Sequence, residues 1–200
     1  MRMTQRFTKP DTWNGGGYEV AIVLGAVDDD RLRRGLQAVW DFPSVIGCYL
    51  RSDVEPDQQP RIQSADAEWF ETLRGVATLP AGAVACHSMV VREEDAGGED
   101  WIYFGFPLGA LSELMPSVGA FPFEDGGDFS WRREVDEWLC ALARQVFERV
   151  PFRFAVVGWV DGSESPPVPE ERWVGYLVPE DNVLTWHPPN RMAPMAIGAP

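Results

Sequence analysis

The sequence predicts an α+β fold, a mostly antiparallel sheet with two main helices, within a single domain at residues 1–200. Short segments rich in β-branched residues and bounded by Gly or Pro recur along the chain, which is typical of strands. Only two long segments have apolar residues at helical spacing. Several strand segments follow one another without an intervening helix, which favours α+β over a doubly wound parallel sheet. A chain of 200 residues is long enough to bury a sizeable core without disulfides or metals.

The first half of the chain begins with a strand and a helix. Asp28, Asp29 and Asp30 are suited to the start of a helix, where carboxylates accept free N–H groups, and Pro43 ends that helix. In order, the predicted elements are a strand at 18–24, this helix, a strand at 45–50, a surface loop at 51–66 and a short helix at 67–75 that contains Trp69, Phe70 and Leu73.

The second half begins with a predicted antiparallel hairpin, because two apolar segments flank a turn rich in Gly and acids. The most regular helical spacing in the chain follows at 131–149 and ends at Pro151. In order, the predicted elements are strands at 83–93 and 100–106, a helical turn near 108–114, the helix at 131–149, and strands at 152–160, 172–178 and 183–186. A Pro-rich acidic loop at 161–171 connects the strand at 152–160 to the strand at 172–178. We expect flexible ends at 1–16 and 187–200.

The two halves of the chain resemble each other. The segment Leu24-Gly25-Ala26-Val27 is similar to Leu108-Gly109-Ala110-Leu111, and a strand precedes each. We therefore hypothesise two tandem strand–helix–strand–strand halves at 18–93 and 99–186. This order of elements, over roughly residues 18–178, is similar to that of GyrI-like small-molecule-binding domains. The resemblance implies an aromatic and acidic cleft for cationic compounds, and it assigns no residue.

The charge of the chain restricts its partners. It has 17 Lys and Arg against 31 Asp and Glu, for a formal net charge of −14. Nucleic acids and anionic lipid surfaces are bound largely through Lys and Arg, so we expect neither to be a partner. A basic protein or a small cationic ligand fits this charge. The single lysine, Lys9, leaves no candidate for a Schiff-base or P-loop mechanism beyond the N-terminus.

We expect a cytoplasmic protein. Cys48, Cys86 and Cys140 lie far apart, which is typical of buried thiols in a reducing compartment. The first residues lack the apolar region of a signal peptide, and no apolar run approaches the 18 residues or so that a membrane span requires.

Catalytic and metal-binding signatures are weak. His87 and His187 are the only histidines. Cys86 and His87 are neighbours on a predicted strand, so their side chains diverge and cannot share a metal or form a nucleophile–base pair with Ser88. Gly15 to Gly17 precede a strand rather than follow one, which is wrong for a dinucleotide turn. We expect no metal site, no cofactor and no enzymatic activity.

Nine tryptophans stand out in the composition. On the strand at 100–106, Trp101 and Tyr103 share one face, and Ile102 and Phe104 share the other with Phe106. The second face is suited to the core. The first face is therefore available to line a cleft or to contact a partner.

These observations favour a non-enzymatic protein-binding module, similar in kind to immunity or antitoxin proteins that cover a basic partner. The candidate binding residues are Trp101, Tyr103, Trp159, Glu99 and Asp100. The sequence leaves the partner's identity and the oligomeric state open.

Two alternatives remain. The first is a small-ligand-binding domain with an aromatic and acidic cleft, which requires Trp101, Tyr103, Trp138 and Trp159 to converge. The second is an enzyme that uses carboxylates or Cys86 and His87, which requires perturbed pKa values clustered in a cleft.

Overall fold

The structure is a computed structural model that describes residues 7–68, 70–93, 97–118, 129–162, 165–181 and 183–191. Its strands are β1 (Gly17–Ala26), β2 (Val45–Tyr49), β3 (Leu73–Leu79), β4 (Gly82–Arg92), β5 (Glu99–Pro107), β6 (Phe154–Gly158), β7 (Gly175–Glu180) and β8 (Val183–His187). Its α-helices are α1 (Asp29–Trp40), α2 (Leu108–Leu114) and α3 (Arg132–Arg149), and its short 3-10 helices are η1 (Pro10–Trp13), η2 (Pro56–Gln58), η3 (Ser64–Asp66) and η4 (Pro116–Val118).

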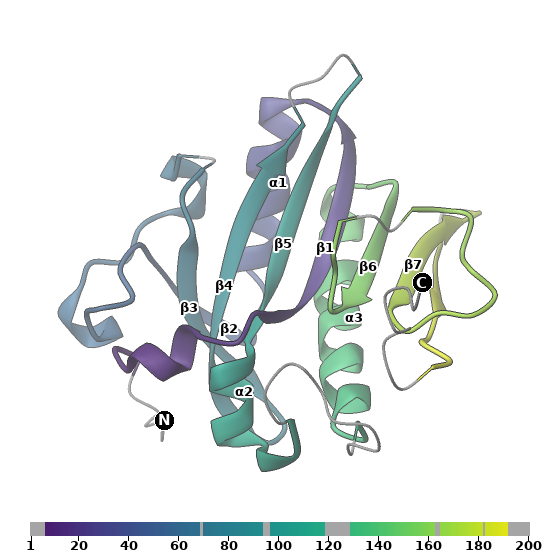
Figure 1. The fold of residues 1–200 in the computed structure, drawn as a ribbon. Coiled ribbons are helices and arrows are strands. Elements are labelled where there is room, and N and C mark those ends of the chain that lie inside the picture. Colours follow the sequence, from purple (N-terminus) through teal and green to yellow (C-terminus); the bar gives the residue numbers. More distant parts are fainter. Residues whose placement is uncertain are drawn as a thin grey trace, which may run out of the picture.

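One eight-stranded sheet forms the frame, in the order β2-β3-β4-β5-β1-β6-β7-β8 (Figure 1). Every neighbouring pair is antiparallel, which confirms the predicted α+β class. At the centre, β1 pairs with β5 from Gly17↔Pro107 to Ala26↔Glu99, with one irregularity between Val23 and Gly25. The predicted hairpin of β4 and β5 is likewise present.

The two long helices lie behind the sheet in Figure 1 and cover one face of it. Helix α1 begins as predicted, because the Asp28 carboxylate accepts the Arg31 backbone N–H at 2.9 Å. Helix α3 packs Val135, Leu139 and other apolar residues into the same main core. The alternation predicted for β5 is confirmed, since its even-numbered residues are fully buried on this helix side: Ile102, Phe104 and Phe106.

The opposite face of the sheet, the open face, has no helix of this length against it in Figure 1. The connection between β6 and β7 covers part of it. Its Val160, Val168, Trp173 and Val174 pack with strand residues in a second apolar cluster: Ala21, Val23, Trp101, Phe154, Val156 and Tyr176. The central strand β1 is consequently buried on both faces.

The described residues near each end of the chain contact the rest of the fold. Residues 1–6 and 192–200 lie outside the described part. Phe7 is fully buried, and its ring contacts Trp13 and Tyr49 edge-on at 4.9 and 6.2 Å. At the other end, the backbone N–H groups of Asn190 and Arg191 both donate to the carbonyl of Arg172.

The predicted helix at 67–75 is wrong. Strand β3 starts within it, at Leu73, and pairs along its length with β4. Arg74, Gly75 and Thr78 interrupt the apolar residues of this segment, which hid the strand, and Trp69 lies outside the described residues.

The two halves share an order of elements but differ in where their strands lie. In the first half β1 is followed by helix α1 and three more strands, and in the second half β5 is followed by helices α2 and α3 and three more strands. The strand after the helix is β2 at the edge of the sheet in the first half, but β6, beside β1 near the centre, in the second. Matching strands therefore do not occupy equivalent positions.

Among the helices that the structure describes, none combines the length and apolar character needed to cross a membrane.

Gly75 on β3 provides a test of the packing between sheet and helices. A Cβ at this position would lie 2.6 Å from Trp40 Cζ3 and 2.9 Å from the backbone oxygen of Ile46. We expect Gly75→Ala to lower the free energy of unfolding by about 1 to 3 kcal/mol, because the core is close-packed. Thr78→Ala, a half-buried position on the same strand, is the control. Equal losses for both variants in urea unfolding would contradict this packing.

Candidate functional site

Trp101 and Tyr103 lie together on the open face, as the alternation along β5 predicts. Their rings stack with centroids 6.1 Å apart and an interplanar angle of 17°. Trp101 is 7% exposed and its ring also meets Phe154 edge-on at 5.9 Å, whereas Tyr103 is half-buried. Tyr103 extends toward the β6–β7 connection, because a Cβ on Gly162 would lie 3.7 Å from its hydroxyl.

Asp100 has a structural role rather than the predicted binding role. Its carboxylate is 1% exposed and accepts from Arg92 Nε at 2.7 Å and from the backbone N–H of Asp28 at 2.9 Å. Arg92 also donates to Asp29 at the start of α1, at 2.7 Å. The hairpin is thereby attached to the first turn of α1. The neighbouring Glu99 forms an ion pair with Arg153.

Trp159 belongs to a different aromatic cluster, where it stacks on Trp173 at 4.7 Å and 12° and meets Trp131 edge-on at 5.7 Å. Trp138 lies on the helix side of the sheet, 5.9 Å from Phe104 and stacked on it. The structure therefore distributes Trp101, Tyr103, Trp138 and Trp159 over three places instead of one cleft.

A buried polar triad, Tyr18, Asp136 and Arg132, lies beside the Trp159–Trp173 stack. The Tyr18 hydroxyl donates to Asp136 and accepts from Arg132 Nε, the latter at 2.9 Å. Arg132 is 3% exposed, and its guanidinium lies 5.0 Å from the centroid of the Trp159 ring and 5.5 Å from that of Trp173. These rings stabilise the buried cation, whose Nη1 has no hydrogen-bond partner. Sequence reasoning missed the triad because Tyr18 on β1 is more than a hundred residues away from Arg132 and Asp136 on α3.

On β4, the side chains of Cys86 and Ser88 share one face of the sheet and that of His87 lies on the other, as expected. Cys86 and Ser88 are fully buried, and Ser88 accepts the Trp40 indole N–H at 3.0 Å. Burial, followed by the nearby Arg74 guanidinium, lowers the pKa of His87 to about 4, so its imidazole is neutral at pH 7.

The cysteine thiols are poor nucleophiles at neutral pH. All three cysteines are free and buried. Burial raises the pKa of the Cys48 thiol to about 12, and it raises the pKa of Cys86 and Cys140 as well. Within the described ranges, no three His, Cys, Asp or Glu residues are grouped to hold a metal ion.

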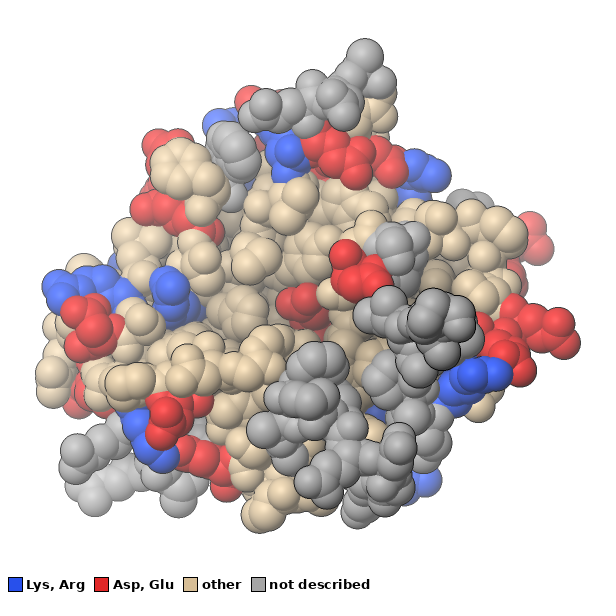
Figure 2. Space-filling model, in the orientation of Figure 1, with Lys and Arg blue, Asp and Glu red and all other residues tan. Residues whose placement is uncertain are grey.

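Met89 and Val91 of β4 complete an apolar surface that sequence reasoning missed. Both alternate onto the open face, where Met89 pairs with Tyr103 and Val91 pairs with Trp101. Met89 is 39% exposed and Val91 is 41% exposed. We call these four residues the hairpin face. In Figure 2, which shows the open face, uncharged residues occupy most of the upper central area, acidic side chains lie near the centre below it, and further charged side chains lie around the margin.

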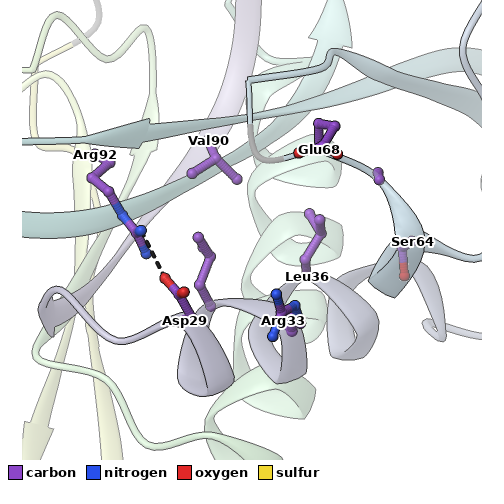
Figure 3. Close-up of a pocket in the computed structure, with 9 residues that line it drawn as sticks. Asp29, Arg33, Leu36, Ser64, Glu68, Val90 and Arg92 are labelled. Carbon is purple, nitrogen blue, oxygen red and sulfur yellow. Dashed lines mark hydrogen bonds and ion pairs between the residues drawn. The ribbon is translucent and has the colours of Figure 1, made fainter.

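A cavity of about 150 Å³ lies on the other side of β4, between that strand, α1 and the segment around η3 (Figure 3). In Figure 3, Val90 points down from β4 and Leu36 points up from α1. The buried and half-buried lining is mostly apolar and the exposed lining is charged: Leu32, Leu36, Val90 and Ala67 with the polar Ser64 and Arg92, and Asp29, Arg33 and Glu68. The cavity is large enough for a side chain and much smaller than a typical cofactor site.

Comparisons of this chain with protein-family models, with curated proteins and with solved structures found no significant match. The similarity in element order to GyrI-like domains gains no support from them.

Asp136 gives the buried triad a measurable pH dependence. Burial raises the pKa of this carboxyl from its ordinary 3.8 to about 6, against the opposing effects of Tyr18 and Arg132. The protonated form therefore stabilises the fold below about pH 4, and this contribution is lost as the pH rises through about 6.

Asp136→Asn removes this titration. We expect the free energy of unfolding of the variant, relative to the unmodified protein, to rise by about 2 kcal/mol from pH 4 to pH 7. Urea unfolding at the two pH values measures it. A difference that does not change with pH would show that Asp136 titrates normally.

Proposed function

We propose that this protein is an acidic, non-enzymatic protein-binding module that binds a basic partner on the hairpin face. The observation that carries the proposal is the pairing of exposed Met89 and Val91 with the Trp101–Tyr103 stack on one sheet face. The solvated face of an antiparallel sheet is usually polar, so an apolar and aromatic surface there favours a contact with another molecule.

The composition of the hairpin face fits a protein interface. Met and aromatic residues are enriched at interface centres, and aromatic side chains are frequent binding hot spots. Tyr103 contributes ring area and a hydroxyl, and the stack with Trp101 fixes its orientation before binding. A preordered side chain loses less conformational entropy on association.

The net charge of −14 favours a basic partner. An acidic field attracts positively charged proteins and raises their association rate, and salt weakens this effect. This combination of an acidic surface and an apolar contact area is what an immunity or antitoxin protein needs to cover a basic toxin. We extend the proposal to that class.

The hairpin face also favours this function over a small-ligand cleft. The ligand-binding alternative requires Trp138 and Trp159 near the Trp101–Tyr103 stack, but Trp138 packs on Phe104 and Trp159 on Trp173. Trp159, Glu99 and Asp100 are consequently left out of the proposed contact surface.

The double substitution Met89→Asp with Val91→Asp tests the hairpin face. We expect it to weaken binding of the basic partner at least about a hundredfold, because each change places a carboxylate in an apolar contact. The partner would be captured at low salt from the organism that encodes the chain, identified by mass spectrometry, purified and titrated. Binding should also weaken as salt rises.

Val183→Asp is the matched control, because this valine is 66% exposed and lies on β8, at an edge of the sheet away from the hairpin. It adds the same charge and should change affinity little. Recovery of no stoichiometric basic partner, or equal binding by the control and the double variant, would overturn the proposal.

A further inference from the structure

The last four residues of β4, Met89–Arg92, have a free strand edge, although β4 lies between β3 and β5 in the sheet. Strand β3 ends its pairing with β4 at Leu73↔Ser88, whereas β4 continues to Arg92 and pairs there with β5 alone. Figure 1 shows β4 and β5 extending past the end of β3. Within the described part of the chain, the segment Met89–Arg92 therefore has a paired strand on one side only. We call its other side the β4 edge.

The backbone groups of Val90 and Arg92 point to the β4 edge. The N–H of Glu93 donates to the carbonyl of Glu99 at 3.1 Å, so Glu93 faces β5. Successive residues of a strand direct their backbone groups to opposite sides. Val91 and Met89 therefore also face β5, while Val90 and Arg92 face the β4 edge.

Among the described residues before β3, none pairs with these groups. The N–H of Glu71 donates instead to the carbonyl of Glu68, at 2.9 Å. No backbone hydrogen bond joins Val90 or Arg92 to another described residue across the β4 edge. Such an edge is a template for an added strand.

The cavity of Figure 3 lies directly under this edge. Val90 forms part of its wall from β4, and Leu32 and Leu36 form the opposite wall from α1. The side chains of an added strand would alternate between two faces, as those of β4 do. One side chain of the added strand, on the helix side, would enter the cavity. The side chains before and after it would lie on the open face, beside Met89 and Val91.

The charges around the cavity favour a basic segment. Asp29 and Glu68 line the cavity, and the carboxylates of Glu71 and Glu93 are nearby in the chain. The lining arginines are Arg33 and Arg92, but Arg92 is committed to Asp29 and Asp100. Arg33 in turn lies beside Asp30, so the acidic groups Asp29, Asp30, Glu68 and Asp100 outnumber the two arginines, and lysine or arginine beside an aliphatic residue would be complementary.

We propose that the partner binds by adding an extended basic segment to the β4 edge, with one aliphatic side chain in the cavity between α1 and β4. This inference rests on the proposed function and specifies how the partner is recognised. Main-chain hydrogen bonds to Val90 and Arg92 supply affinity, and the cavity supplies selectivity for a side chain of about valine or leucine size.

A defined peptide tests the geometry. The probe is an acetylated and amidated peptide of the sequence Lys-Val-Arg-Val-Lys-Val-Arg, titrated into the isotopically labelled full chain. We expect the amide resonances of Val90 and Arg92 to shift and their hydrogen exchange to slow. The same peptide N-methylated at alternate residues, in the frame that faces β4, should bind at least about tenfold more weakly. An analogue of the peptide in which Glu replaces every Lys and Arg should not bind.

Val90→Pro removes the N–H at the β4 edge, and Val90→Ala is its matched control because it shortens the same side chain and retains the N–H. Proline is tolerated where a strand's N–H faces solvent, so both variants should fold. We expect Val90→Pro to bind the peptide at least about tenfold more weakly than Val90→Ala. Ala67→Phe, which fills the cavity, should also weaken binding.

The outcomes separate the two proposals. Equal binding by the proline and alanine variants, tight binding of both N-methylated frames, or no binding of the basic peptide would overturn strand addition. If the captured partner binds Val90→Pro normally but fails to bind the hairpin-face double variant, the proposed function stands and strand addition fails. If it binds both variants normally, the proposed function fails as well. A proline-sensitive dimer in sedimentation would assign the edge to a second copy of this chain and overturn the proposal.

Discussion

The pairing of β1 with β5 over their whole length is the constraint on which the rest of the structure depends. These two strands come from different halves of the chain, and each separates the other from the strand that follows it in sequence: β5 lies between β1 and β2, and β1 lies between β5 and β6. Val20 and Ile22 of β1 are buried against the helices, while Ala21 and Val23 are buried on the open face. A central strand without a polar face has only one stable environment, which is the middle of a sheet covered on both sides.

The two faces of the sheet are covered to different extents, and this difference leaves part of the β4–β5 hairpin exposed. Helices α1 and α3 cover one face, whereas the β6–β7 connection covers only part of the other. The hairpin of β4 and β5 extends past this connection and past β3, so it presents both an apolar face and an unpaired edge. Asp100 and Arg92 fix the hairpin to α1, which keeps these surfaces in place and leaves Asp100 itself inaccessible.

Local patterns predicted much of this fold. The acidic run before α1, the helical spacing of α3 and the alternation on β5 each depend on residues close in sequence, and each is confirmed. Strand β3 was missed because Arg74 and Gly75 interrupt its apolar residues, and Gly75 is explained only by the Trp40 ring that approaches it from α1. The candidate site was predictable in part. Alternation identified Trp101 and Tyr103, but the free β4 edge depends on β3 being shorter than β4, a long-range pairing that no local pattern specifies.

The parallel stack of Trp159 on Trp173 joins the end of β6 to the segment that leads into β7. Two indoles held face to face at 4.7 Å couple their electronic transitions. This coupling gives the protein an intrinsic optical signature in circular dichroism, at the strong far-ultraviolet band of indole. The signature exists only while the β6–β7 connection lies on the sheet, so the seating of that connection can be followed in solution without an added label.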